Sequence, residues 1–198
     1  MRKAAVGALL LLVTGWIYSG AARAADADKA WAALARGGHV IVVRHGNAPD
    51  GAKASDTIPP SIEGCVTQRN LDALGRKQSV ALGDMLRERK VVVDKVLVSA
   101  WCRTKETAFL MKLGPASEET PMWKRIGTRT ANVEEAAAEI KDLASQWKGP
   151  GNLLIINHGS TMRSVFDIGH PPQPAEMIVL KPLSIGRVEV VGAIDPPK

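Results

Sequence analysis

A run of apolar residues leads directly into three residues that could do chemistry together. Residues 40–43 are four β-branched residues in succession, and Arg44, His45 and Gly46 follow them. Such a run predicts a fully buried strand of a parallel sheet, and open α/β sheets bind ligands beyond the carboxyl ends of their strands. A guanidinium matches phosphate oxygens, and glycine lets the backbone approach an anion closely. The stretch suits a histidine that attacks phosphorus, although Arg44 and His45 alone also fit an ordinary loop.

A second stretch of the chain has the same form. Residues 153–156 are Leu-Leu-Ile-Ile, and after one asparagine they lead into His158 and Gly159. Ser160 and Thr161 come next and could open a helix. Two apolar strands that both end in His-Gly favour a shared site over coincidence.

These motifs resemble those of the histidine phosphatase superfamily, the phosphoglycerate-mutase-like proteins, whose exported bacterial members include a phosphatase acting on phosphorylated heptose of lipopolysaccharide. The first family motif is Arg-His-Gly, whose histidine becomes transiently phosphorylated, and two arginines and a second histidine complete the phosphate pocket. The matching residues here are Arg44, His45, Arg103 and His158, and residues 68–78 resemble the Leu-Thr-x-x-Gly-x-x-Gln segment of the family. The resemblance covers nearly all of the chain after its first two dozen residues, in the right order.

Strands that alternate with helices predict a three-layer α/β/α fold with a mainly parallel sheet, in a single domain over residues 25–198. Helices are expected over residues 28–36, 71–90, 103–113 and 132–147, with a short one ending near residue 168. Strands are expected over residues 40–43, 95–99, 152–157, 176–180 and 187–191. All three motif loops then fall at the carboxyl ends of strands, on one edge of the sheet.

Residues 1–24 have the pattern of a secretory signal peptide. Arg2 and Lys3 form a basic start, residues 4–18 are apolar, and residues 22–24 read Ala-Arg-Ala, an A-x-A cleavage site. The apolar run is short for a membrane span. Cleavage and export to the periplasm, or secretion, are therefore favoured over an uncleaved membrane anchor, and no stable membrane insertion is expected after cleavage.

Length and charge fit a single small domain with no special affinity for polyanions. The chain has 198 residues and a formal net charge of +6, enough residues to bury a core. Cleavage would remove three basic residues and no acidic one, which leaves +3. This value gives no reason to expect nucleic acid as a partner. A locally positive pocket around Arg44 and Arg103 would still steer a small phosphorylated substrate.

The only two cysteines are Cys65 and Cys102. Because an exported protein meets an oxidising compartment, we predict a disulfide between them. It would tie the loop after the first motif to the loop that carries Arg103. Two separate buried thiols are the alternative, and no four-ligand zinc spacing is present.

Three further segments bear on the predicted pocket. Arg103 is expected at a helix start, where it and the helix N-terminus would favour phosphate; the alternative is a pair with Glu106. Residues 47–63 predict a long loop over the pocket that sets specificity, or else an idle surface loop. Residues 122–130 are ambiguous, and His170 is interpreted as a plain surface residue.

The resemblance implies phosphoryl transfer in two steps. Neutral His45 attacks phosphorus in line, and water then hydrolyses the phosphohistidine. Arg44, Arg103 and a protonated His158 would neutralise charge on the equatorial oxygens. No cofactor is implied, since the cations are side chains. A zinc site using both histidines is the weaker alternative, because no carboxylate lies at a conventional ligand spacing.

The general acid is not identified by any local motif. One family branch carries Asp directly after the second histidine, where this chain has Gly159, and Ala48 replaces the threonine of the Arg-His-Gly-x-Thr pattern. Expelling an alkoxide needs a proton donor near the leaving oxygen. The candidates are Asp50, Glu118, Glu119, Glu134, Glu135 and Glu176.

The sequence therefore predicts an exported, metal-independent phosphatase acting on a phosphomonoester, with a phosphorylated envelope sugar as a reasonable substrate. Two alternatives remain open: a phosphomutase, which would need a second phosphate site, and a non-catalytic anion-binding module of the same fold. The physiological substrate and the oligomeric state are left open.

Overall fold

The computed structural model of the chain describes residues 26–49, 65–117, 133–166 and 168–197. The predicted signal peptide, most of the predicted loop over the pocket, and residues 122–130 lie outside these ranges. No helix within the described ranges is long and apolar enough to cross a membrane.

The strands form one six-stranded sheet in the order β3-β2-β4-β1-β5-β6. They are β1 (Val40–Arg44), β2 (Val93–Val98), β3 (Ala116–Ser117), β4 (Asn152–Asn157), β5 (Met177–Ser184) and β6 (Arg187–Ile194). The pairs β3–β2, β2–β4 and β4–β1 are parallel, whereas β5 runs antiparallel to both β1 and β6. The prediction of a mainly parallel sheet is confirmed.

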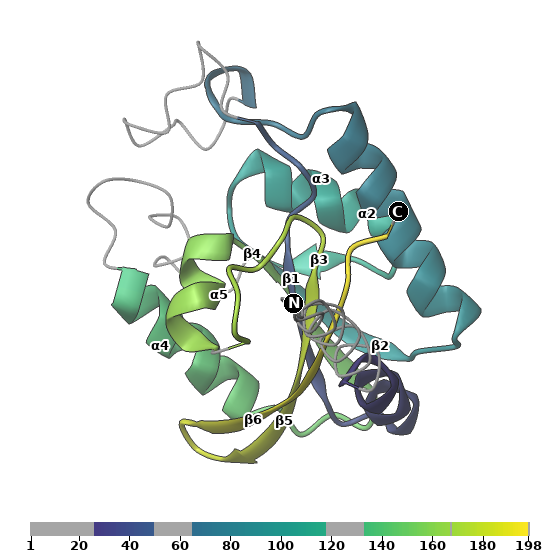
Figure 1. Cartoon of the computed structure of the whole chain (residues 1–198), viewed down its shortest axis with the longest axis vertical. Helices are drawn as coiled ribbons and strands as arrows, with labels where there is room; N and C mark the ends of the chain where they lie inside the picture. Colours follow the sequence, from purple (N-terminus) through teal and green to yellow (C-terminus); the bar gives the residue numbers. More distant parts are fainter. Residues whose placement is uncertain (1–25, 50–64, 118–132, 167, 198) are drawn as a thin grey trace, which may run out of the picture.

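Helices cover both faces of this sheet (Figure 1). The helix over 26–36, α2 (Ala73–Glu88) and α3 (Cys102–Met111) contribute to the buried cluster on one face. The helices α4 (Val133–Ser145) and α5 (Gly159–Val165) contribute to the cluster on the other face. The predicted three-layer α/β/α arrangement is confirmed.

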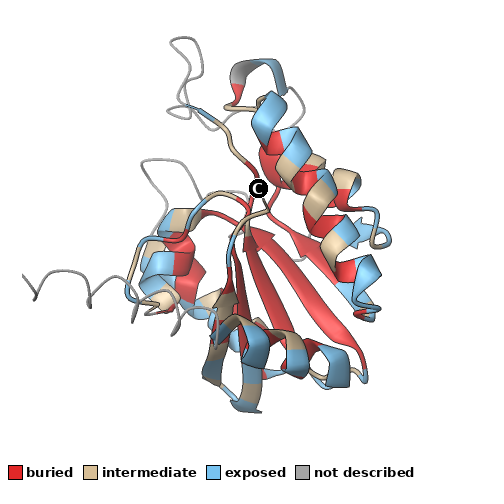
Figure 2. Cartoon of the chain, turned by 45° about the vertical axis from the view of Figure 1, so that its right-hand side comes forward, coloured by how far each residue is buried: buried red, intermediate tan, exposed pale blue. Residues whose placement is uncertain are grey.

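The position of β1 between two covered faces of the sheet explains why residues 40–43 are all apolar. Ile41 and Val43 belong to one core cluster, while Val40 and Val42 belong to the other, and all four side chains are fully buried. Successive strand residues point to opposite faces of a sheet, so a strand covered on both faces needs apolar residues at every position. Figure 2 shows the central strands buried and the helices buried only on their inner sides.

The predicted elements differ from the observed ones mainly at their ends. The helix expected over 71–90 covers Ala73–Glu88, because the Asp72 side chain caps it by accepting a hydrogen bond from the Gly75 N–H at 2.7 Å. The two C-terminal strands are longer than expected and form a hairpin. The strand β3 was not predicted, because its two residues are too few to show a periodicity.

Asn152 joins three segments at the amino end of β4. Its Nδ2 donates to the carbonyl oxygens of Leu34 and Val92, at 3.0 and 2.8 Å, and its Oδ1 accepts from the His39 N–H at 3.2 Å. Asn152 is fully buried, so these groups have no solvent to replace the amide. The side chain thereby fixes the helix over 26–36 and the start of β1 against β4.

We expect Asn152→Ala to lower the free energy of unfolding by about 2–4 kcal/mol, because it leaves buried backbone groups without partners. Urea unfolding followed by circular dichroism measures the change. The matched control is Gln146→Ala, which removes an amide that bonds Asp142 on the exposed side of the chain and should cost less than about 0.5 kcal/mol. Equal losses in the two variants would contradict this role.

Candidate active site

Strand register brings the motif residues to one edge of the sheet. Arg44 pairs with Asn157, and Val98 pairs with Ile156. The ladder continues one step further, since the His45 N–H donates to the Asn157 carbonyl oxygen at 3.0 Å. All three motif loops therefore leave parallel strands at the same level, as the sequence predicted.

A cavity of about 260 Å³ lies at this edge. The structure brings all four predicted site residues together there, and their chemical roles remain predictions. The residues that line the cavity are Arg44, His45, Arg69, Arg103, His158, Gly159, Ser160, Arg163 and Pro172. Arg69 and Arg163 were not predicted to be part of the site. Arg163 lies four residues after Gly159 on α5, a spacing that puts both on one helix face, and this signal could have found it.

His45 is held in the form that a nucleophile needs. Its ring is buried, and Nδ1 lies 2.7 Å from the Gly46 carbonyl oxygen. A carbonyl only accepts hydrogen bonds, so Nδ1 carries the proton and Nε2 keeps its lone pair. Burial and the charge of Arg103 are the main causes that lower the pKa of His45 to about 3. His45 is therefore neutral at neutral pH.

His158 lies beside His45, with ring centroids 5.3 Å apart. Its Nε2 is 3.0 Å from the Ser99 hydroxyl oxygen, and its ring meets that of Trp101 edge-on. Burial and then the charge of Arg103 hold the pKa of His158 well below its ordinary value. His158 is therefore neutral in this structure, because a buried imidazolium beside guanidinium groups is unfavourable. The expectation of a protonated His158 concerns the phosphate-bound site and stays a prediction. A bound phosphate dianion would raise that pKa by attraction.

Arg103 is buried at the start of α3, with 1% of its surface exposed. Its guanidinium carbon lies 4.8 Å from the centre of the Trp101 ring, within range of a cation–π contact. The alternative pair with Glu106 is not formed, since that carboxylate accepts a hydrogen bond from Arg76 at 2.6 Å. The guanidinium of Arg103 instead lines the cavity.

Arg44 is supported from the turn that precedes β5. Its Nη1 donates to the Pro172 carbonyl oxygen at 2.7 Å. A Cβ on Gly159 would lie 3.0 Å from Cδ of Arg44, so glycine leaves room for this side chain to cross α5. Burial, then the charges of Arg69 and Arg163, lower the pKa of Arg44, while Glu176 opposes them.

His170 is not the plain surface residue that the sequence suggested. Its Nε2 lies 2.7 Å from Oε1 of Glu176, whose side chain is fully buried. The other carboxylate oxygen of Glu176 accepts from the Gln173 N–H at 2.6 Å. The pair closes the 170–176 turn that also carries Pro172. A hydrogen bond across an irregular turn has no sequence period, so pattern reasoning missed it.

Gly46 is required by packing on α2. A Cβ at this position would lie 2.4 Å from the Gly75 carbonyl oxygen, and the Gly46 N–H donates to Thr107 at 3.2 Å. From the sequence, Gly46 was expected to let the backbone approach an anion. The structure gives a different reason, because the residue lets the loop after β1 lie directly against the first turn of α2.

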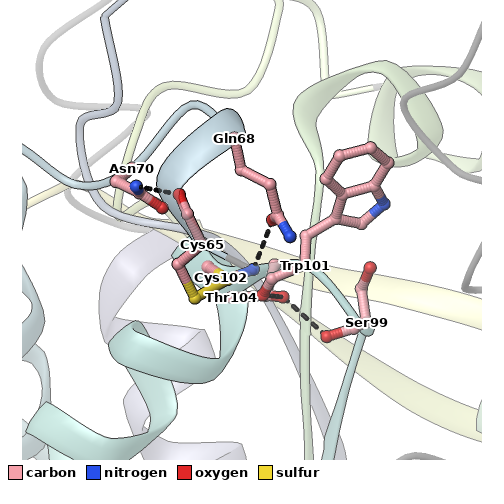
Figure 3. Close-up of a disulfide and its surroundings, with 7 residues drawn as sticks. All are labelled: Cys65, Gln68, Asn70, Ser99, Trp101, Cys102 and Thr104. Atoms are coloured by element: carbon pink, nitrogen blue, oxygen red, sulfur yellow. Dashed lines mark hydrogen bonds between the residues drawn. A yellow bond between two sulfur atoms is a disulfide. The ribbon is translucent and has the colours of Figure 1, made fainter. Parts of the chain in front are cut away.

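The predicted disulfide between Cys65 and Cys102 is confirmed, with Cα atoms 5.7 Å apart (Figure 3). Cys65 opens a short 3₁₀ helix, η1 (Cys65–Thr67), and Cys102 is the first residue of α3. Beside the disulfide, the side-chain oxygen of Gln68 accepts from the Cys102 N–H at 2.9 Å. The disulfide and this hydrogen bond hold Arg69 and Arg103 on the same side of the cavity.

None of the candidates for the general acid that the structure describes is placed to donate a proton in the cavity. Asp50, Glu118 and Glu119 lie outside the described residues. Glu134 and Glu135 are exposed in the first turn of α4 and do not line the cavity, and the oxygens of Glu176 are engaged by the 170–176 turn. Within the described part of the chain, no group of three or more His, Cys, Asp or Glu residues is placed to hold a metal ion.

Comparison with known proteins gives a structural likeness without a sequence match. No protein-family model matches the sequence, and no curated protein matches it. A structure of the protein histidine phosphatase SixA with tungstate has a TM-score of 0.54 and 20% identity, covering 79% of this chain and 96% of that chain. A mycobacterial glucosyl-3-phosphoglycerate phosphatase with VO3 has a TM-score of 0.52 and 15% identity, covering 77% and 96%. A phosphoserine phosphatase from Entamoeba histolytica gives 0.51 and 13%, covering 79% and 96%.

The chain therefore has the fold of the histidine phosphatase superfamily, as its motifs predicted. Because these identities are only 13–20%, the structural likeness establishes the fold alone. The function is inferred below from the residues of the cavity.

We expect the double variant Cys65→Ala, Cys102→Ala to lose about 3–4 kcal/mol of unfolding free energy, since the disulfide closes a loop spanning 37 residues. Its affinity for inorganic phosphate should fall several-fold, because Arg69 is no longer tied to the start of α3. Chemical unfolding and titration calorimetry measure the two effects. Dithiothreitol should reproduce them in the unaltered chain, and unchanged stability after reduction would contradict the prediction.

The lowered pKa of His45 predicts a pH-dependent stability. Between pH 6.5 and about 3 the unfolded chain protonates this imidazole and the folded chain does not, so the free energy of unfolding falls as the pH falls. His45→Gln removes this contribution, and the stability lost between pH 7 and pH 5 should shrink by about 2 kcal/mol. Urea unfolding at the two pH values tests it; identical losses in both proteins would show that His45 titrates normally.

Proposed function

We propose that this chain is a phosphatase that hydrolyses a phosphomonoester through a covalent phosphohistidine on His45. The observation that carries the proposal is the cavity itself, in which a neutral, oriented imidazole lies among the guanidinium groups of Arg44 and Arg103 and beside His158. A nucleophile with a free lone pair surrounded by cations suits a dianionic phosphate. Tungstate and VO3, held by two phosphatases of the same fold, support this reading.

In the first step, Nε2 of His45 forms a bond to phosphorus while the ester P–O bond breaks in line. The electron pair of that bond stays on the ester oxygen, which takes up a proton from water and leaves as the alcohol. The two arginines would neutralise the equatorial oxygens, so most of the rate enhancement would come from positioning and electrostatics. The arriving dianion raises the pKa of His158, which then becomes an additional donor to the phosphoryl group.

In the second step, water attacks the phosphohistidine and its oxygen bonds to phosphorus, the P–N bond breaks, and its electron pair returns to Nε2. The proton of the water passes to solvent, and inorganic phosphate is released. His45 is a good leaving group here, because burial beside Arg103 favours the neutral imidazole. The Nδ1 hydrogen bond to the Gly46 carbonyl keeps the ring oriented through both steps. The cations of the site are side chains, so the proposed reaction needs no metal.

We place the reaction in the periplasm or outside the cell. The basic start, apolar run and A-x-A site of residues 1–24 support export, and a disulfide next to the cavity suits an oxidising compartment. A phosphorylated envelope sugar is a substrate of the right chemistry in that compartment. Sugar-phosphate interconversion is cytoplasmic, which disfavours a mutase.

The test is hydrolysis of p-nitrophenyl phosphate and a panel of phosphosugars in EDTA by the unaltered chain, beside His45→Ala. We expect turnover that persists in EDTA and falls about 10³-fold or more in the variant, since the nucleophile is lost. His39→Ala is the matched control, because His39 is a buried histidine at the opposite end of the same strand.

Retention of activity in His45→Ala would overturn the phosphohistidine mechanism. Phosphate binding without turnover in either protein would favour a non-catalytic anion-binding module. Activity lost only in EDTA would favour a metal site.

A further inference from the structure

Glu176 and Arg44 lie opposite each other on neighbouring strands. The antiparallel ladder of β5 and β1 pairs Met177 with Val43, and one step further the Arg44 N–H donates to the Glu176 carbonyl oxygen at 3.1 Å. Side chains of directly opposite residues leave a sheet on the same face. The charge of the Glu176 carboxylate reaches the guanidinium, because it opposes the causes that lower the pKa of Arg44.

The Glu176 carboxylate is fully buried and holds the 170–176 turn together. One of its oxygens lies 2.7 Å from Nε2 of His170, and the other accepts from the Gln173 N–H at 2.6 Å. The ring of His170 is fixed in turn, since its Nδ1 lies 3.0 Å from the Ile168 carbonyl oxygen. A buried carboxylate is costly unless such contacts satisfy it, so the side chain has one strongly preferred place.

The backbone of this turn needs that support. Ala175 is fully buried and has a φ of 64°, in the left-handed region that is unfavourable for a residue with a Cβ. Its N–H donates to the carbonyl oxygens of Arg44 at 3.0 Å and His45 at 3.2 Å. Backbone in this region persists only where surrounding contacts hold it, and the Glu176 carboxylate supplies two of them.

The turn touches the proposed catalytic groups directly. The Pro172 carbonyl oxygen accepts from Nη1 of Arg44 at 2.7 Å, and Ala175 bonds the backbone on either side of the peptide that joins Arg44 to His45. A shift of the turn would therefore move both the guanidinium and the backbone that carries the nucleophile. Small displacements of this kind lower rates strongly, because the reacting groups lose their alignment.

We infer that Glu176, together with His170, is a positioning residue of the phosphate site: the carboxylate holds the 170–176 turn, and the turn holds the guanidinium of Arg44 toward the phosphate. The inference rests on the proposed function and deepens it. Glu176 acts without touching the substrate, since both its oxygens face the turn and it is not among the described residues that line the cavity.

Substitution of Glu176 tests this role through phosphate binding and turnover. Titration calorimetry gives the dissociation constant of inorganic phosphate, and p-nitrophenyl phosphate gives kcat/KM. We expect Glu176→Ala to raise the first and lower the second at least tenfold. Glu176→Gln should remain within threefold of the unaltered chain in both, because its amide oxygen can accept from the Gln173 N–H and its amide nitrogen can donate to His170.

The matched control is Asp94→Ala. The Asp94 carboxylate also ties a loop to the sheet, accepting from the Gly151 N–H at 2.6 Å, but it lies at the amino ends of β2 and β4, away from the cavity. Asp94→Ala should change neither quantity more than twofold. The side chain of His170 is 26% exposed, so His170→Ala removes the other half of the pair without emptying a fully buried site. It should weaken phosphate binding about fivefold and carries the test if Glu176→Ala does not fold.

A double-mutant cycle with Arg44→Gln separates positioning from a general loss of stability. Because the turn acts through Arg44, adding Glu176→Ala or His170→Ala to Arg44→Gln should change kcat/KM and the phosphate dissociation constant less than twofold. Equal losses in the two backgrounds would overturn the inference. So would phosphate binding that survives both alanine substitutions, or a Glu176→Gln variant as weak as Glu176→Ala, which would show that charge acts and the turn does not.

The two proposals fail in different ways. If p-nitrophenyl phosphate is hydrolysed through His45 but the losses are independent of Arg44, the phosphatase stands and the positioning role is wrong. If phosphate binding depends on Glu176 through Arg44 but no phosphate compound is turned over, the positioning role stands and the chain is not this enzyme. An unaltered chain that does not bind phosphate would overturn both.

Discussion

The parallel pairing of β1 with β4 is the constraint on which the site depends. Arg44 lies opposite Asn157 in this register, so His45 and His158 leave their strands at the same level and face one another 5.3 Å apart. A slip of one residue would send every side chain of β1 to the opposite face. Asn152 fixes the same pair of strands at the other end through its three side-chain hydrogen bonds.

Burial of His45 and His158 determines the protonation state of both side chains. Removing two imidazoles from water beside Arg103 costs stability at acidic pH, but it keeps His45 neutral at the pH where a nucleophile is needed. The Gly46 carbonyl accepts a hydrogen bond from Nδ1 of His45 and so determines the tautomer of that ring. The close approach of Gly46 to Gly75 fixes this carbonyl against α2. The disulfide between Cys65 and Cys102 adds a covalent tie between the segment that carries Arg69 and the start of α3, which carries Arg103.

Much of this could be predicted from the sequence, because apolar runs, helix periods and turn residues are local signals. The strands before His45 and His158 followed from such signals, and the disulfide followed from the cysteine count and the expected export. The role of Arg103 was implied mainly by the family resemblance. Features that depend on tertiary contacts could not be predicted in this way. Arg69 lines the cavity from a segment that the disulfide and the Gln68 hydrogen bond tie to the start of α3. His170 bonds Glu176 across a turn that folds back on itself. Burial of His158, which keeps it neutral, likewise follows from packing.

The central claim is that His45 carries the phosphoryl group, and the most direct measurement is to trap that intermediate. The unaltered chain would be mixed with excess p-nitrophenyl phosphate, quenched in alkali within milliseconds, where phosphohistidine is stable, and digested for mass spectrometry. The account predicts one added phosphoryl group on the peptide that contains His45. A phosphoryl group on another residue, or rapid turnover with no phosphorylated peptide at any quench time, would contradict it.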